Sequence, residues 1–187
     1  MSVKIEKLVF GGAGLGHLDD PEKPTGLGVS GRVVFVWKAL PGEEVEFELI
    51  KKENTHWEGV ATKILNPSSA RLEPKEAHFL SCSPWQIMTQ DEENKWKIEM
   101  ANETYKKLGD LEMERLEIVG DENIWGYRNK MEYSFGEGDG GITLSFFERG
   151  KKVRQRIEAC ELANLEINRV AKLILGWINK NKFRCAG

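Results

Sequence analysis

Cationic and aromatic side chains alternate within residues 125–156, the part of the sequence with the clearest chemical signal. Seven lysines and arginines stand there against four acidic residues: Arg128, Lys130, Arg149, Lys151, Lys152, Arg154 and Arg156 against Glu132, Glu137, Asp139 and Glu148. Cations neutralise phosphates, and aromatic rings stack on unpaired bases at roughly 1–3 kcal/mol per base. The pattern is compatible with contact to RNA, but basic strand faces are common, and composition alone more often indicates a solvated sheet face with its aromatic side chains in the core.

Charge is distributed unevenly along the chain. The net charge over 187 residues is −3. Residues 125–187 carry twelve basic and seven acidic residues, whereas residues 72–124 carry six basic and thirteen acidic ones. Because a net charge averages over segments that differ, the acidic total does not exclude a nucleic-acid partner.

The glycine-rich segment Gly11–Gly16 could in principle cradle a phosphate. Its spacing is not G-x-G-x-x-G, no Lys-Ser/Thr pair follows it, and no helical pattern comes next. A dinucleotide site requires that strand-turn-helix context. We therefore expect these glycines to serve a tight turn or a close backbone approach.

Cysteines and histidines are few and scattered. The sequence contains no C-x-x-C pair, and a zinc or iron–sulfur site uses about four ligands at defined spacing. We expect Cys82 and Cys160 to be partly buried, reduced thiols without a metal. The histidines His17, His56 and His78 stand apart from any serine or cysteine pattern, so no catalytic triad is expected.

The first 65 residues alternate between apolar and polar residues with a period of two, which predicts short strands. In 44–50, for example, Val45, Phe47 and Leu49 share one face and three glutamates the other. About five such strands joined by Gly and Pro turns favour a small barrel. Residues 67–74 contain two prolines and no periodicity, which indicates a linker between two domains.

Beyond the linker, the patterns predict helices over 89–108 and 165–181 and strands over 125–135, 142–147 and 152–157. In the first of these strands, Arg128 and Lys130 would project together from the polar face. No apolar run approaches the ~18 residues that span a bilayer, and the N-terminus lacks a signal-peptide core. The expected location is the cytoplasm.

Two stretches resemble the bacterial RNA uracil-5-methyltransferases. Ile5–Gly16, with Val33–Val36 and Ala39–Glu43, closely resembles the TRAM domain, an OB-like RNA-binding barrel. Trp125–Lys130, which reads W-G-Y-R-N-K, resembles a segment of the central domain of the same enzymes. Together with Ile157–Cys160, the resemblance covers almost the whole chain in the right order.

The resemblance implies a β-rich α+β protein, with a TRAM barrel at 1–66, a linker at 67–74 and an incomplete α+β central domain at 75–187. The family's S-adenosylmethionine-binding fold, nucleophilic cysteine and catalytic base would lie further on, and Cys185 lacks the family's surrounding pattern. We therefore expect no catalytic residue here, and an RNA-recognition portion that binds rRNA or tRNA. The alternatives are a stand-alone RNA-binding protein, a recognition subunit with a catalytic partner in trans, or a remnant used for protein contacts.

The resemblance also implies site residues. The matching motif assigns RNA contacts to Tyr127, Arg128, Asn129 and Lys130, and on the barrel we expect contacts from Lys7, Arg32 and Lys38. Family members with a [4Fe–4S] cluster carry four cysteines at positions that align here with Glu76, Cys82, Trp85 and Cys160. Only two of these are thiols, so we expect no cluster, and S-adenosylmethionine is expected only in the catalytic domain.

Overall fold

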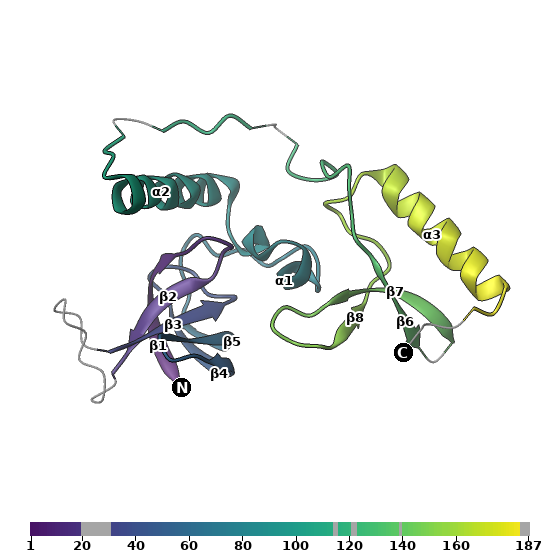
Figure 1. The fold of residues 1–187 in the computed structure, drawn as a ribbon, viewed down its shortest axis with the longest axis horizontal. Helices are drawn as coiled ribbons and strands as arrows, with labels where there is room; N and C mark the ends of the chain where they lie inside the picture. The colour runs from purple at the N-terminus through teal and green to yellow at the C-terminus, as the bar shows by residue number, and fades with distance from the viewer. Residues whose placement is uncertain (20–30, 114–115, 121–122, 139, 184–187) are drawn as a thin grey trace. The chain divides into compact units, whose positions relative to one another are not determined.

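The computed structural model describes residues 1–19, 31–113, 116–120, 123–138 and 140–183. Contacts divide the chain into two compact units (Figure 1). The first unit comprises Met1–Pro74 and Pro84–Val119, and the second comprises Lys75–Ser83 and Gly120–Gly187. Among the described helices, none has the length and apolar character needed to cross a membrane.

Five strands of the first unit close into a barrel, as the sequence predicts. They are β1 (Ser2–Leu8), β2 (Gly14–Leu18), β3 (Arg32–Trp37), β4 (Glu44–Lys52) and β5 (His56–Asn66). Their order around the barrel is β1-β2-β3-β5-β4, with β3 parallel to β5 and the other pairs antiparallel. Alternate side chains fill the interior, and the buried core is Val3, Ile5, Val34, Val36, Ala39, Val45, Phe47 and Ala61.

The glycine-rich segment forms the tight turn between β1 and β2 and then β2 itself. Gly11 and Gly12 have φ values of 91° and 92°, the left-handed region that glycine adopts without strain. A Cβ on Gly16 would clash with the Lys4 carbonyl oxygen, so the backbones of β1 and β2 approach too closely for a larger residue. Both expected uses of these glycines are confirmed.

A buried ion pair joins the turn between β3 and β4 to the segment that follows β5. Glu43 is fully buried, and Arg71 donates to both of its carboxylate oxygens at 2.6 Å from Nε and Nη2. The backbone N–H groups of Leu40 and Ser68 donate to the same carboxylate at 2.8 and 3.0 Å. Arg71 Nη2 also donates to the Lys38 carbonyl. These contacts join the β3–β4 turn to the segment that leaves β5.

The predicted helix at 89–108 is confirmed as α2 (Gln90–Gly109), which follows a short 3₁₀ turn, η1 (Pro84–Ile87). Thr89 caps its N-terminus by accepting a hydrogen bond from the Glu92 N–H, and three acidic residues complement the dipole of the first turn. Tyr105 and Leu108 on this helix are exposed. The contact with β1 is polar instead, with Lys7 paired to Glu103.

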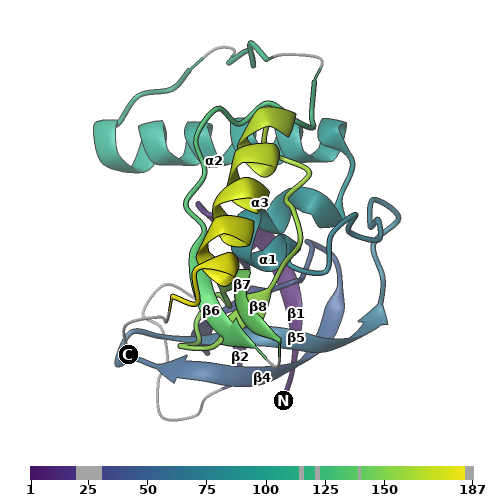
Figure 2. The ribbon, with the colours of Figure 1, turned by 90° about the vertical axis from the view of Figure 1, so that its right-hand side faces the viewer.

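The second unit is a small sheet covered on one face by a helix. Strands β6 (Ser134–Gly138), β7 (Gly141–Phe147) and β8 (Arg154–Arg156) pair antiparallel in the order β6-β7-β8. Helix α3 (Leu165–Lys180) packs on β7 (Figure 2), and the four-residue α1 (Phe79–Cys82) also contacts β7. The buried core is Leu144, Phe146, Ile157, Cys160, Leu162, Ala163 and Ala171. The fold class and the helix at 165–181 are thus confirmed.

The predicted strand over 125–135 is wrong for most of its length, because regular pairing begins only at Ser134. Gly126 adopts a φ of 67°, which interrupts an extended chain. The backbone of Arg128 instead pairs with the chain near Ala163, donating to the Leu162 carbonyl and accepting from the Asn164 N–H. Tertiary hydrogen bonds therefore decide the conformation of this segment, and alternation of residue types alone is a poor guide to it.

Replacing Arg71 with Ala should destabilise the barrel by about 3–5 kcal/mol, the cost of leaving a buried carboxylate without its partner. Burial alone would raise the pKa of Glu43, but Arg71 and the two N–H groups hold it below its usual value. The native carboxylate therefore stabilises the barrel above the usual carboxyl range and stops doing so as the pH falls through the folded pKa. In the variant, burial raises the pKa of Glu43, so protonation removes the unpaired charge and the deficit relative to the wild type should shrink as the pH falls.

Amide hydrogen exchange in barrel peptides, measured between pH 3 and pH 7 (roughly the range of carboxyl titration), checks this expectation. The matched control is Lys63→Ala, which removes an exposed cation from β5 and should change barrel stability by less than about 0.5 kcal/mol. Equal exchange in both variants would contradict the prediction.

Candidate functional site

The outward side of β3 carries aromatic side chains. Val34 and Val36 point into the barrel and are fully buried, so Val33, Phe35 and Trp37 point outward and are half-buried. His17 on β2 and His56 on β5 lie opposite Val33, and the His56 ring meets Phe35 edge-on at 5.0 Å. Phe10, in the β1–β2 turn, is 97% exposed. We call Phe10, Phe35, Trp37, His17 and His56 the aromatic face.

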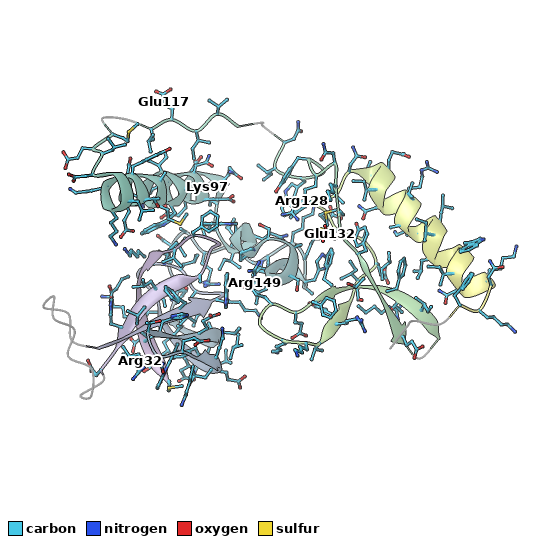
Figure 3. The ribbon with its side chains drawn as sticks, viewed as in Figure 1. Arg32, Lys97, Glu117, Arg128, Glu132 and Arg149 are labelled. Carbon is cyan, nitrogen blue, oxygen red and sulfur yellow. The ribbon has the colours of Figure 1, made fainter. Side chains whose placement is uncertain are left out.

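The expected barrel cations do not form one patch. Lys7 pairs with Glu103 of α2. Arg32 and Lys38 stand at opposite ends of β3, about 20 Å apart for a strand of this length. Arg32, which Figure 3 labels, lies over the Trp57 ring at 4.8 Å, and Lys52 lies 4.6 Å from the same ring. Lys38 has a φ of 65° and offers its carbonyl to Arg71. The aromatic face, which no sequence motif singled out, is the more concentrated feature of the barrel.

The residues of the W-G-Y-R-N-K segment differ in how exposed their side chains are. Tyr127, Asn129 and Lys130 are exposed, and Lys130 lies 3.5 Å from Glu132. Arg128 is half-buried: its guanidinium lies 5.9 Å from the Tyr127 ring and its Nη2 donates to the Cys82 carbonyl at 3.0 Å. Arg128 and Lys130 therefore do not project together, contrary to the sequence-based expectation.

Two arginines hold the end of helix α1. The last carbonyls of a helix lack partners within it. Arg149 Nε donates to the Leu80 carbonyl at 3.0 Å, while Arg128 donates to that of Cys82 (Figure 3). The Cys82 thiol itself donates to the Phe79 carbonyl at 3.6 Å. The hydrogen bond from Arg128 is a structural use of this residue that the motif alone does not reveal.

Exposed cations gather where β7 turns into β8. We call Lys151, Lys152, Arg154 and Arg156 the basic hairpin, and all four are exposed. The register pairs Phe147 with Arg154 and Ser145 with Arg156, so both arginines lie on the sheet face opposite the one that packs on α3. Arg154 also lies 5.0 Å from the half-exposed Phe147 ring. Cation and aromatic ring thus meet here as the composition of 125–156 suggested.

Four potential metal ligands converge inside the second unit. Glu76, His78, Cys82 and Cys160 each offer one donor atom, and all these atoms lie within 4.8 Å of one another. Glu76 Oε2 is 3.4 Å from Cys82 Sγ and 3.8 Å from Cys160 Sγ, while Glu76 Oε1 is 3.0 Å from His78 Nε2. We call these residues the Cys–His–Glu cluster. The sequence indicated three of its positions, and His78 was missed because it matches no spacing.

The residues of the Cys–His–Glu cluster shift one another's pKa values. A hydrogen bond from the Cys82 thiol lowers the pKa of Cys160 and correspondingly raises that of Cys82. Burial alone would lower the pKa of His78, but Cys160 and Glu76 raise it above the usual value. Burial raises the pKa of nearby Tyr133 to about 12. These shifts arise from contacts within the cluster, and the thiolate is the form of cysteine that binds metals.

Backbone contacts hold the cluster from outside. Asn168 on α3 accepts from the Cys160 N–H and donates to the Cys160 carbonyl, at 3.1 and 2.9 Å. Tyr133 Oη donates to the Asn168 oxygen at 2.9 Å and so orients that amide. The Glu161 N–H donates to Glu76 Oε1 at 2.7 Å. The donors are thus arranged in advance by the second unit itself.

The glycine-rich turn of the barrel lacks the setting of a nucleotide-binding loop. A nucleotide cofactor is typically held where a glycine-rich turn leads from a strand into a helix. Here the glycine-rich turn leads into β2, which pairs with β1 and β3. Cys185, which the sequence analysis set aside as a nucleophile, lies outside the described residues.

The sequence of this chain is similar to those of RNA methyltransferases. The chain is 27% identical to an uncharacterised RNA methyltransferase of Clostridium tetani, over 83% of this chain and 36% of the relative. It is 29% identical to the 23S rRNA (uracil(1939)-C(5))-methyltransferase RlmD of Nitrosococcus oceani, over 84% of this chain and 34% of the relative. No protein-family model matches.

The fold is also similar to that of a solved structure, the Pyrococcus abyssi tRNA (uracil-54, C5)-methyltransferase in complex with S-adenosyl-L-homocysteine. The TM-score is 0.56 at 19% identity, over 97% of this chain and 37% of the other. The resemblance to RNA uracil-5-methyltransferases is thus confirmed. The chain spans about a third of the length of the relatives that it matches.

Proposed function

We propose that this chain is the RNA-recognition portion of an S-adenosylmethionine-dependent RNA uracil-5-methyltransferase, acting on rRNA or tRNA in the cytoplasm. The observation that carries the proposal is the match to RNA methyltransferases over most of this chain and about a third of theirs. Cofactor binding and chemistry would belong to a separate catalytic domain.

The strand order supports a TRAM-type, OB-like barrel as the first recognition element. An OB barrel has five strands and binds oligonucleotides on the face of strands 2 and 3 and on the neighbouring loops. In this chain that face and the β1–β2 loop carry Phe10, Phe35 and Trp37. Unpaired bases stack on such rings with little dependence on sequence.

The basic hairpin supports a second, electrostatic contact. Phosphate contacts require exposed cations, and the hairpin presents Lys151, Lys152, Arg154 and Arg156 together with Phe147. Lys130 and Asn129 are exposed as well and remain proposed contacts. Arg128 remains one too, although part of its donor capacity is used by Cys82.

Recognition of this kind has a physical purpose in base methylation. An enzyme that modifies a base must first take it out of its stack, which costs a few kcal/mol. Contacts to the flanking RNA offset that cost and position the target. A recognition portion can therefore be separate from the residues that perform the chemistry.

Neutralising three cations of the basic hairpin should flatten the salt dependence of RNA binding. We consider the triple variant Lys152→Ala, Arg154→Ala, Arg156→Ala. The slope of log Kobs against log salt should fall in magnitude by about 2, because each lost phosphate contact contributes about 0.7. Fluorescence anisotropy with a labelled RNA hairpin measures the slope.

The matched control removes three exposed cations from α3 in the same unit: Arg169→Ala, Lys172→Ala, Lys180→Ala. Both variants lose the same charge, so only a local contact distinguishes them. The proposal for the hairpin fails if both slopes change equally, and the proposed function fails if the wild-type chain does not bind RNA even at low salt.

The aromatic face should contribute affinity that does not depend on salt. Phe10→Ala should weaken binding of single-stranded loop RNA by about 1–3 kcal/mol, the range for one stacked base, and leave the salt slope unchanged. The control is Tyr105→Ala, which removes a half-exposed ring from α2. Equal affinity of the two variants would argue against stacking on the barrel.

A catalytic domain should contact the exposed side of α3. Leu173, Ile174 and Trp177 are exposed there, beside an apolar groove of about 430 Å³ between α3 and the sheet. Because the chain spans about a third of its relatives, we assign this surface to a methyltransferase catalytic domain, in the same protein or in trans.

A photocrosslinking residue at Leu173 in cells should capture a methyltransferase catalytic domain, whereas one at Lys107 on α2 should not. Capture of the domain on a separate polypeptide would favour a recognition subunit that acts in trans. Crosslinks only to proteins without such a domain, or none, would contradict this use of α3.

A further inference from the structure

We propose that Glu76, His78, Cys82 and Cys160 bind a single zinc ion in tetrahedral coordination, in place of an iron–sulfur cluster. Zinc is bound by thiolate, imidazole and carboxylate ligands, and structural sites use four of them. The Cys–His–Glu cluster supplies two sulfurs, one nitrogen and one carboxylate oxygen.

The separations between the donors fit one ion. With Zn–S bonds of about 2.3 Å and Zn–N and Zn–O bonds of about 2.0–2.1 Å, tetrahedral donors stand about 3.3–3.8 Å apart. Glu76 Oε2 lies 3.4 and 3.8 Å from the two sulfurs. All four donor atoms lie within 4.8 Å of one another, so small side-chain movements complete the coordination shell.

The same donors do not fit a [4Fe–4S] cluster. Such a cluster needs a ligand for each of four irons, normally four thiolates spread around it. Here two of the four donors are sulfurs, and they converge on one point. Trp85, at a third family position, carries no ligand atom and belongs to η1 in the first unit. The substitutions have therefore changed the kind of metal that the site can hold.

His78 gives an independent indication that a ligand is missing from the donor set. Its side chain is nine-tenths buried, and its Nε2 has no partner in hydrogen-bond geometry among the described residues. Glu76 Oε1 is 3.0 Å from that nitrogen but not aligned with it. Burying a polar atom without a partner is unfavourable, and coordination to a metal removes that cost.

The metal would link distant parts of the second unit. Glu76, His78 and Cys82 lie in or beside α1, whereas Cys160 follows β8 and is anchored by Asn168 of α3. Arg128, from the W-G-Y-R-N-K segment, donates to the Cys82 carbonyl and acts as a positioning residue for that ligand. Hydrogen bonds of this kind around a metal site orient its ligands.

The test is metal analysis of the full chain, purified without a metal-binding tag. Elemental analysis should find one zinc per chain. Replacing zinc with Co²⁺ should give the intense visible absorption of tetrahedral cobalt and a thiolate-to-cobalt charge-transfer band. These measurements use the wild-type protein and do not depend on a variant that folds.

Ligand variants then assign the site. Cys82→Ser and Glu76→Gln should each weaken zinc binding by about 100-fold or more, measured by competition with a chromogenic chelator. The control is Glu161→Gln, which removes a carboxylate beside Cys160 that pairs with Lys75 instead, and it should leave zinc affinity within about twofold.

The positioning role of Arg128 has its own readout. Arg128→Ala should weaken zinc binding by about 10–100-fold and shift the cobalt charge-transfer band, and Arg128→Lys should recover part of both effects. Lys130→Ala, two residues away and exposed, should change neither.

Four results would overturn the proposal. They are a chain isolated without stoichiometric metal, iron and sulfide at four per chain, an octahedral cobalt spectrum, and a Cys82–Cys160 disulfide in protein trapped directly from cells. Each of these results concerns the metal site alone, so the zinc proposal can be wrong while the chain still binds RNA.

Discussion

A carboxylate that leaves water must find compensating partners, and each unit of this chain is organised around one buried glutamate. Glu43 is satisfied by Arg71 and by two backbone N–H groups, which ties the β3–β4 turn to the chain leaving β5. Glu76 accepts a hydrogen bond from the Glu161 N–H, and around it stand a histidine and two sulfurs. The first carboxylate is fully neutralised by protein groups, whereas the second faces ligands for a cation. This difference separates a structural ion pair from a candidate metal site.

The groups proposed to contact RNA owe their exposure to regular structure. Closing the barrel sends alternate residues of β3 inward, so the remaining ones form an aromatic outer surface. In the second unit, α3 covers one face of the sheet, which leaves Arg154 and Arg156 on the other. Stacking and phosphate contact are thus assigned to different units. Either contribution can be removed without disturbing the other, because the variants concerned do not touch a shared core.

Arg128 belongs to a motif that suggested RNA contacts, and it also has a structural role. The W-G-Y-R-N-K resemblance suggested a row of RNA contacts, and Tyr127, Asn129 and Lys130 are exposed as such contacts require. Arg128 instead turns toward the Cys82 carbonyl, and with Arg149 it completes the end of a helix only four residues long. A helix so short has few internal hydrogen bonds. It is therefore held by external donors, and its position decides whether Cys82 reaches Cys160.

Local periodicity, capping residues and contiguous motifs are enough to predict the five barrel strands, both long helices, the resemblance to RNA methyltransferases and the segment that carries the basic hairpin. Each of these features depends on residues that are neighbours in the chain. Residues 125–133, in contrast, are irregular because their hydrogen bonds go to residues 161–164. The tertiary structure also decided that Arg32 and Lys38 stand apart and that His78 joins Glu76, Cys82 and Cys160. These facts depend on contacts between residues distant in the chain, which composition and spacing do not encode.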